Sequence, residues 1–305
     1  MQNWPLVSSI TVNYNQTQVT LELLASLRQI TYPDFEVIVV DNASREDPSP
    51  AIRAEFSEVK VIVSSENLGF AGGNNLALSE AKGKYLLYLN NDTEVSPDFL
   101  EPLVKTMEDN PKIGVCSPKI RFFYKPNTIQ YAGSSPLHSL RIASYTYGYG
   151  QEDKGQFNLT GPTNLAHGAA MIVSREVIEK AGKMPEEFFL YYEELDWCEI
   201  IKRAGYQIYY VSESLVLHKE SISTGKSSNL QLYYKTRNRI LLARRNLKSL
   251  KKWTALSYLS ITAIADILKL MLKGDVKRLK VYFDALLWHV QPSAKAKKTF
   301  SASTS

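Results

Sequence analysis

Short apolar runs alternate with helical patterns along the first 115 residues of the chain. Residues 7–12, 35–40, 59–63 and 85–89 are rich in valine, isoleucine, leucine and tyrosine, whereas residues 20–29, 74–81 and 97–110 carry apolar side chains at helical spacing. Continuous apolar strands separated by helices are typical of a parallel sheet that is covered on both faces. We therefore predict an α/β fold with a mainly parallel central sheet and helices on both faces.

Polar clusters follow each of these four apolar runs. They are Asn13-Tyr14-Asn15, Asp41-Asn42-Ala43-Ser44, the glycine- and asparagine-rich residues 67–75, and Asn90-Asn91-Asp92. Ligands of open α/β sheets bind beyond the carboxyl ends of the strands. The four clusters therefore predict one shared binding site at that edge of the sheet.

The second half of the chain has a less regular pattern. Residues 120–165 are rich in tyrosine, glycine, serine and proline, which indicates a long loop region or small irregular strands over the site. Further strands are expected at 171–174, 206–211 and 215–217, and helices at 175–181 and 196–204. After residue 225 the pattern is helical to about 289, and the last dozen residues are expected to be frayed. We therefore expect a catalytic domain over 1–225 and a helical, basic segment over 226–305.

The composition describes a globular protein, because hydrophobic residues make up 44% of the 305 residues and charged residues 22%. Cys116 and Cys198 cannot form a disulfide framework, and neither lies in a C-x-x-C pattern. A reducing cytosol fits this cysteine usage. The first five residues carry no basic segment, so we expect no signal peptide.

Basic residues gather in the last quarter of the chain, although the net charge is only +5. This asymmetry favours an anionic partner such as a membrane surface or a phosphorylated lipid over nucleic acid, and the alternative is an ordinary basic tail. Residues 253–272 are apolar but contain Asp266 and Lys269, which favours a helix that lies in the membrane interface over one that spans the membrane. The alternative is an amphipathic helix that packs on protein.

Three of the polar clusters contain candidate ligand-binding groups. Asp41 could accept hydrogen bonds from a ribose or a base, or could simply cap a turn. The glycines of residues 67–75 permit the backbone to approach a ligand closely, and the alternative is that they form a tight connection between a strand and a helix. Asp92, exposed after a buried strand, is placed to bind Mg²⁺ or Mn²⁺ and so to offset the charge of a diphosphate, or is a solvated turn residue. His218 follows another apolar run and is a candidate second metal ligand, although a lone histidine is often structural.

Three acids, Glu193, Glu194 and Asp196, follow the aromatic residues 188–192. Neighbouring carboxylates beside an apolar wall raise each other's proton affinity, which suits a general base. Acidic residues in the first turn of a helix also stabilise the helix. The residues alone leave both interpretations open.

Taken together and in this order, the motifs resemble glycosyltransferase family 2, the inverting class with the GT-A fold, over residues 10–245. The similarity is greatest to the rhamnosyltransferase-like and galactofuranosyltransferase-like branch, whose members assemble cell-surface polysaccharides. The matching elements are the V-x-Y-N, D-N-x-S, N-x-G-F-A-x-G-x-N, N-x-D and acidic motifs, followed by Val216-Leu217-His218 and the basic residues 233–239.

The resemblance implies roles for individual residues. Donor nucleotide binding falls to Val12, Asn13, Tyr14, Asn15, Asp41, Asn67, Gly69, Gly73, Asn74 and Asn91. Asp92 and His218 would bind the metal, Mg²⁺ or Mn²⁺. Glu194 corresponds to the catalytic base, and Glu193 and Asp196 remain alternatives because this position is usually an aspartate. Arg237 and Arg239 would face the donor diphosphate or an acceptor phosphate.

The resemblance also implies a reaction, its partners and a location. A nucleotide-sugar donor, such as dTDP-rhamnose or a UDP-sugar, would pass its sugar to a hydroxyl of a glycan or a polyprenyl-diphosphate-linked acceptor in one displacement, with inversion. The expected location is the cytoplasm, at the inner face of the membrane. One alternative is an inactive nucleotide-sugar-binding protein of the same fold. A nucleotidyltransferase would need a phosphate loop rich in glycine and lysine, and residues 12–18 contain neither.

Overall fold

The computed structural model describes residues 4–220 and 228–290 of the chain. The strands are β1 (Val7–Asn13), β2 (Phe35–Asp41), β3 (Lys60–Val63), β4 (Tyr85–Leu89), β5 (Thr93–Val95), β6 (Ile113–Phe122), β7 (Lys125–Tyr131), β8 (Gly161–Thr163), β9 (Ala170–Ser174) and β10 (Gln207–His218). The α-helices are α1 (Thr17–Leu27), α2 (Ser49–Glu55), α3 (Gly69–Leu76), α4 (Leu100–Asp109), α5 (Arg175–Ala181), α6 (Glu193–Arg203), α7 (Asn229–Asn246), α8 (Ser249–Leu272) and α9 (Val276–Leu287). The boundary expected at 225/226 and the frayed last dozen residues lie outside the described residues.

All ten strands belong to one sheet, whose main order is β3-β2-β1-β4-β9-β6-β10-β5. Strands β1 to β4 are parallel to one another, and β6 is parallel to β10. β9 runs antiparallel between β4 and β6, and β5 runs antiparallel to β10. The predicted α/β class with a mainly parallel sheet is confirmed, with antiparallel strands added in its second half.

Each inner strand is buried on both faces because alternate side chains enter two different cores. Val37 and Val39 join the core that contains residues of α1, α2 and α4. Ile38 and Val40 join the core that contains residues of α3, α5 and α6. This two-sided burial explains why the strands appear in the sequence as unbroken apolar runs.

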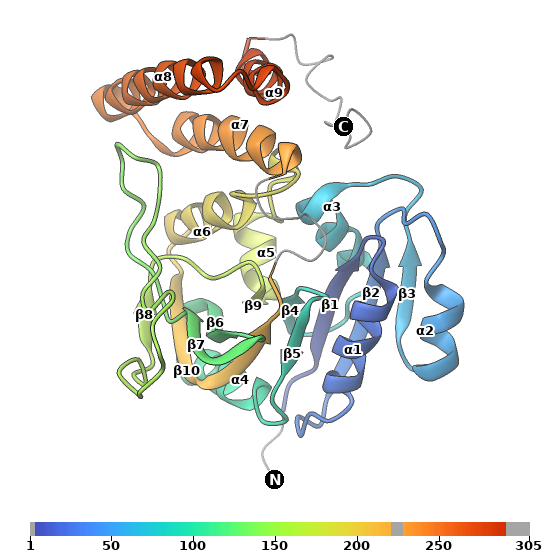
Figure 1. Ribbon diagram of the computed structural model, residues 1–305. Coiled ribbons are helices and arrows are strands. Elements are labelled where there is room, and N and C mark those ends of the chain that lie inside the picture. The colour runs from blue at the N-terminus through green and yellow to red at the C-terminus, as the bar shows by residue number, and fades with distance from the viewer. Residues whose placement is uncertain (1–3, 221–227, 291–305) are drawn as a thin grey trace.

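Helices α7, α8 and α9 form a separate layer beyond α6 and α3 (Figure 1). Leu242 of α7 and Leu259 of α8 pack with Phe188, which lies in a short 3-10 helix (Glu186–Phe188) before α6. Val281 and Ala285 of α9 pack with aromatic residues of α7. The helical C-terminal segment predicted from the sequence is therefore confirmed, and it contacts the catalytic half through α7.

The structure corrects the prediction for several segments. Residues 120–165 were expected to form a long loop region or small irregular strands, and they contain β7, which pairs with β6 through register shifts, and the three-residue β8. The strands expected at 206–211 and 215–217 are one strand, β10, whose register shifts between Val211 and Leu215. Helix α2 was not predicted, because Pro48 and Pro50 are typical of a turn and Ile52 is its only buried apolar side chain.

Candidate active site

An open pocket of about 260 Å³ lies at the carboxyl ends of β1, β4 and β10, where the sequence predicted a site. We call it the donor pocket. Its wall combines polar groups with aromatic side chains from the segment before α6. The lining residues are Val12, Tyr14, Asn42, Asn67, Gly69, Phe70, Asn90, Asn91, Asp92, Phe189, Leu190, Tyr191, His218, Glu220 and Leu230.

Asp92 and His218 meet in this pocket, although 126 residues separate them along the chain. Asp92 follows β4, His218 ends β10, and β10 pairs with β5 directly after Asp92. The Asp92 Oδ1 and His218 Nε2 atoms are 3.1 Å apart, and the His218 Nδ1 lies 2.8 Å from the Gln130 Oε1. With the amide oxygen accepting from Nδ1, the Nε2 lone pair of a neutral imidazole faces the Asp92 carboxylate.

These two groups fit a small divalent cation. Neighbouring ligands on an octahedral ion with bonds of about 2.1 Å lie about 3 Å apart, which is the spacing observed between the two atoms. Among the described residues, no cluster of three or more histidine, cysteine, aspartate or glutamate side chains is placed for a metal. A cation held by Asp92 and His218 would therefore keep positions for water and substrate phosphates, as Mg²⁺ prefers.

Asn42 organises the opposite wall of the donor pocket. Its Nδ2 donates to the Asn67 Oδ1 (3.1 Å) and to the Gly69 carbonyl (3.0 Å), and its Oδ1 accepts from the Leu68 N–H (2.8 Å). Gly69 has a φ of +71°, and a Cβ there would lie only 2.3 Å from the Phe189 carbonyl oxygen. The sequence prediction overlooked Asn42, although it is the second residue of the D-N-x-S element.

Five of the predicted nucleotide-binding residues line the donor pocket and five do not. Val12, Tyr14, Asn67, Gly69 and Asn91 form part of the lining. Asn13, Asn15, Asp41, Gly73 and Asn74 are not among the lining residues.

Asp41 is a supporting residue rather than an exposed one, because only 1% of its surface is accessible. Its Oδ1 accepts from the Asn13 Nδ2 (2.8 Å) and its Oδ2 accepts from the Ser44 N–H (3.1 Å). The Asn13 Oδ1 in turn accepts a hydrogen bond from the Thr20 hydroxyl. The oxygen of that hydroxyl accepts a hydrogen bond from the Asn91 Nδ2. This network fixes the ends of β1 and β2 and holds Asn91 at the pocket surface.

A second pocket adjoins the donor pocket, and Tyr191 lines both. We call it the acceptor-side pocket. Glu194, at the start of α6, lies in its wall together with His167, whose ring centroid is 6.1 Å from that of His218. The complete lining is Tyr131, Ser134, Ala143, Ser144, Thr146, Leu165, Ala166, His167, Tyr191, Tyr192, Glu194, Leu195 and Lys235. No sequence motif marked His167, and Lys235 lies within the basic residues 233–239 but was given no role there.

The three acids of α6 occupy different surroundings. Burial raises the pKa of Glu194, and backbone hydrogen bonds and Lys235 offset part of this shift. Glu193 is 4% exposed, and burial followed by repulsion from Glu194 raises its pKa well above the usual range. Only Glu194 of the three faces a pocket.

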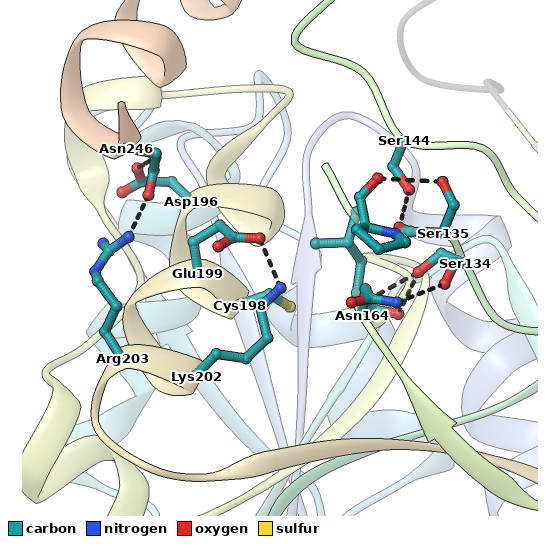
Figure 2. Close-up of polar contacts among 12 residues, drawn as sticks. Ser134, Ser135, Ser144, Asn164, Asp196, Cys198, Glu199, Lys202, Arg203 and Asn246 are labelled. Atoms are coloured by element: carbon teal, nitrogen blue, oxygen red, sulfur yellow. Dashed lines mark hydrogen bonds and ion pairs between the residues drawn. The ribbon is translucent and has the colours of Figure 1, made fainter. Parts of the chain in front are cut away.

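Asp196 is fully buried and paired with α7. Its Oδ2 accepts from the Arg245 Nε (3.0 Å), and its Oδ1 accepts from the Asn246 Nδ2 (2.5 Å). Figure 2 shows Asp196 and Asn246 apart from Ser134 and Ser144 of the acceptor-side pocket. Asp196, an alternative base in the sequence prediction, lines neither pocket, and both of its oxygens join α6 to α7.

The two arginines predicted to face a phosphate line neither pocket. Arg237 is 5% exposed and donates to the backbone carbonyls of Glu187 and Phe188. Arg239 donates to the Arg141 carbonyl and lines a separate cavity of about 150 Å³ between α7, α8 and α9. Arg237 and Arg239 are two residues apart on α7, and side chains at this spacing point in different directions. The two arginines therefore contact different parts of the molecule.

A family model and several known proteins match this chain in sequence. The family model described as glycosyl transferase family 2 matches residues 8–182, more than half of the chain. The low-salt glycan biosynthesis hexosyltransferase Agl10 of Haloferax volcanii is 28% identical over 244 residues, covering 77% of this chain and 74% of that protein. The N-acetylglucosaminyl-diphospho-decaprenol L-rhamnosyltransferase of Mycobacterium tuberculosis is 24% identical, covering 74% of this chain and 81% of that protein.

Solved structures agree on the fold. The mannosyltransferase PcManGT from Pyrobaculum calidifontis, in complex with GDP-Man and Mn²⁺, has a TM-score of 0.59 at 19% identity, over 99% of this chain and 79% of that chain. GalNAc-T7 with UDP, GalNAc and Mn²⁺ has a TM-score of 0.63 at 18% identity, and the match spans 78% of this chain but only 48% of that chain. Both likenesses support the GT-A-like fold. The chain belongs to glycosyl transferase family 2 and is a glycosyltransferase.

Proposed function

We propose that this glycosyltransferase inverts the anomeric carbon of a sugar as it passes from a nucleotide-diphosphate donor to an acceptor hydroxyl. The observation that supports this proposal is the pair of adjoining pockets with Tyr191 between them. Asp92 and His218 lie in the first pocket, and Glu194 lies in the second. A sugar bound across this junction would present its reactive carbon between the two sets of groups.

Glu194 is the proposed general base. Its carboxylate takes the proton of the acceptor hydroxyl, whose oxygen forms a bond to the anomeric carbon as the bond from that carbon to the diphosphate oxygen breaks. A base must be deprotonated to act, so transfer is expected to fall as pH drops through the Glu194 pKa. Because burial raises that pKa, the fall begins at a higher pH than for an exposed glutamate.

Asp92 and His218 are the proposed ligands of Mg²⁺ or Mn²⁺, whose chemistry there is to offset the charge of the departing diphosphate. Asn42 and the backbone around Gly69 shape the wall against which the nucleotide binds. Asn13 and Asp41 position this wall from behind. The Mn²⁺ and nucleotides named with the two similar structures support this choice of cofactor and donor class.

The proposed acceptor is a glycan or a polyprenyl-diphosphate-linked sugar at the cytoplasmic face of a membrane. The name of the mycobacterial relative supports a lipid-linked acceptor. Within the described residues α8 is long and apolar enough to cross a membrane by length and composition, which alone is weak support. The better support is its exposed apolar stripe, Leu250, Trp253, Ile261, Ile264 and Leu268, because amphipathic helices with basic flanks lie in the membrane interface.

The test uses purified full-length protein, a panel of nucleotide sugars and Mn²⁺, with nucleotide release and product mass as the measurements. Glu194→Gln is expected to bind donor normally and to lose transfer by a factor of about 10² or more, the scale of a general base. Asp92→Ala is expected to lose both transfer and metal-dependent donor binding. Retention of full transfer by either variant would contradict the role proposed for that residue.

A further inference from the structure

The loop that separates the two pockets has an unusual backbone. Phe189, Tyr191 and Tyr192 have φ values of 63°, 68° and 76°, in the left-handed region that residues with side chains rarely adopt. Phe189 and Leu190 line the donor pocket, Tyr192 lines the acceptor-side pocket, and Tyr191 lines both. Two residues after this loop comes Glu194. The shape of the loop therefore sets the junction at which transfer is proposed.

The loop does not hold this shape with its own hydrogen bonds alone. Its carbonyls at 188, 190 and 191 point toward α7, where the Asn238 Nδ2 donates to all three at distances of 2.9, 2.8 and 2.7 Å. Asn238 is fully buried. The two N–H bonds of a single amide group are thus shared among three carbonyl oxygens of one loop, which would otherwise repel one another.

Arg237 completes the contact from the neighbouring position of α7. Its Nη2 donates to the Glu187 carbonyl (2.7 Å) and the Phe188 carbonyl (2.6 Å), and its Nε donates to the Asn238 Oδ1 (2.7 Å). The guanidinium lies over the rings of Tyr234 and Trp288, 4.8 and 4.6 Å from their centroids. Arg237 is 5% exposed and lines neither pocket, so these donors bind the loop and Asn238 rather than a substrate phosphate.

We infer that Arg237 and Asn238 are positioning residues, which hold the Phe188–Tyr192 loop so that Tyr191 divides the pockets and Glu194 faces the acceptor. The inference rests on the proposed function for the role of Glu194, but the restraint on the loop is independent of it. The loop is also held from the other side, where the Phe189 carbonyl accepts from the Phe70 N–H at 2.6 Å. Helix α7, in the C-terminal segment, is thereby part of the active-site architecture.

Two substitutions at Asn238 test the inference in the full-length protein. Asn238→Asp keeps the shape but replaces the donating nitrogen with an oxygen, and Asn238→Ala removes the donor without adding charge. Leu103→Ala is the matched control, because Leu103 is fully buried in the core on the other face of the sheet and touches neither pocket. Arg237→Lys keeps the charge but loses the planar fork of donors.

Two readouts are needed. Hydrogen exchange follows the Phe189, Leu190 and Asp196 amides, which bond to the carbonyls of Glu186, Phe188 and Tyr192. In both Asn238 variants these amides are expected to exchange faster by about tenfold or more, while those of β4 stay protected. Transfer is expected to lose about 10- to 100-fold in kcat, because a base displaced by an ångström is poorly aligned. Arg237→Lys is expected to fall between wild type and Asn238→Ala.

Leu103→Ala is expected to lose stability but to keep the loop amides protected and kcat unchanged at temperatures where it is folded. Unchanged loop exchange in Asn238→Ala would overturn the inference, as would a kcat loss of the same size in Leu103→Ala. If the wild-type protein transfers no sugar, the proposed function fails, yet the exchange measurement still decides whether α7 restrains the loop.

Discussion

Glu193, Glu194 and Asp196 lie within one turn of α6, yet each side chain meets a different environment. Asp196 is neutralised by Arg245, Glu194 faces a pocket, and Glu193 is buried with no hydrogen-bond donor reaching its Oε2 among the described residues. Burial of a carboxyl group favours its protonated form. The chemistry of this acidic cluster is therefore set by what packs against α6 rather than by its sequence.

The raised pKa of Glu193 predicts how stability depends on pH. Between the ordinary glutamate pKa of about 4.5 and the raised value, the folded protein binds more protons than the unfolded chain, so stability falls as pH rises through this window. Glu193→Gln removes that dependence. We expect a higher Tm than wild type at pH 8 and no advantage near pH 4, where glutamic acid is protonated in both states.

Thermal unfolding across this pH range provides the measurement, with Glu179→Gln as the control. Glu179 lies exposed on α5, so the same chemical change there is expected to leave the Tm almost unaltered. A Glu193→Gln protein that is less stable than wild type at pH 8 would show that the carboxylate is stabilised by the fold.

Residues at strand ends could be predicted from the sequence, because an apolar run and the polar residue that follows it are both local features. Asp92 and His218 were found in this way, and they do share a pocket. The roles of Asp196 and Arg237 could not be predicted, since each depends on a partner about 50 residues away that no local pattern reveals. The place of His167 in the acceptor-side pocket was also not predicted, because its neighbour His218 is distant in the sequence.

Among the elements, the glycine-rich segment shows how tertiary contacts override a local signal. Residues 67–75 were expected to form a turn before a helix at 74–81, but α3 begins at Gly69 and a short 3-10 helix (Ala77–Ser79) follows it. A Cβ at Gly73 would lie 3.0 Å from Val12 of β1. The glycines therefore bring a helix close to the sheet, although their low helix propensity favours a turn.

Helix α8 has two opposite faces. Ala255, Leu259 and Ala263 are buried against the molecule, whereas Trp253, Ile261 and Leu268 are exposed on the other side. A spacing of three to four residues places each set on one face. The buried face agrees with the alternative of packing on protein, and the exposed face leaves the interfacial helix a prediction.

The exposed stripe predicts membrane binding that depends on particular side chains. Leu268→Glu is expected to weaken binding to vesicles that contain anionic lipid by about tenfold or more, because it removes apolar area and adds a repelled charge. Co-sedimentation with vesicles measures the effect. Leu159→Glu provides the control, since Leu159 is also exposed but precedes Thr160, which contacts β10 on another part of the molecule.

Equal binding by Leu268→Glu and wild type would exclude this stripe as the contact surface. Measuring vesicle binding at higher salt concentration separates the electrostatic contribution from the apolar one. The electrostatic part is screened over a Debye length of about 8 Å at physiological ionic strength, whereas the apolar part remains.

At the scale of the whole molecule, the fold comprises a sheet with helices on both faces and a further helical layer (Figure 1). The alternation of strands and helices in the first 115 residues predicted the sheet, because each unit forms from neighbouring residues. The junction between layers was not predicted. It depends on Asn238, Arg245 and Asn246 of α7, which contact residues about 50 positions earlier in the chain.

This junction predicts where the chain can be shortened. A protein that ends at residue 248 keeps α7 and is expected to bind donor nucleotide nearly as wild type, with a lower Tm because α8 no longer covers Leu241 and Leu242. A protein that ends at residue 225, the boundary expected from sequence, lacks α7 and is expected to bind donor at least about tenfold more weakly, a loss of about 1.4 kcal/mol.

Isothermal titration with nucleotide and Mn²⁺ compares the two shortened proteins, and circular dichroism reports whether each retains the sheet. Equal donor affinity in both would mean that the loop before α6 holds its shape without α7. The position of the functional boundary would then return to residue 225.

The steric clash that a side chain at position 69 would make limits which segments can be exchanged between related enzymes. Since a Cβ at Gly69 would meet the Phe189 carbonyl, the two segments can vary only as a matched pair. A chimera that imports a different segment in place of residues 186–192 must therefore import its own partner for residues 67–75. Replacing only one of the two segments is expected to leave contact surfaces that no longer pack together.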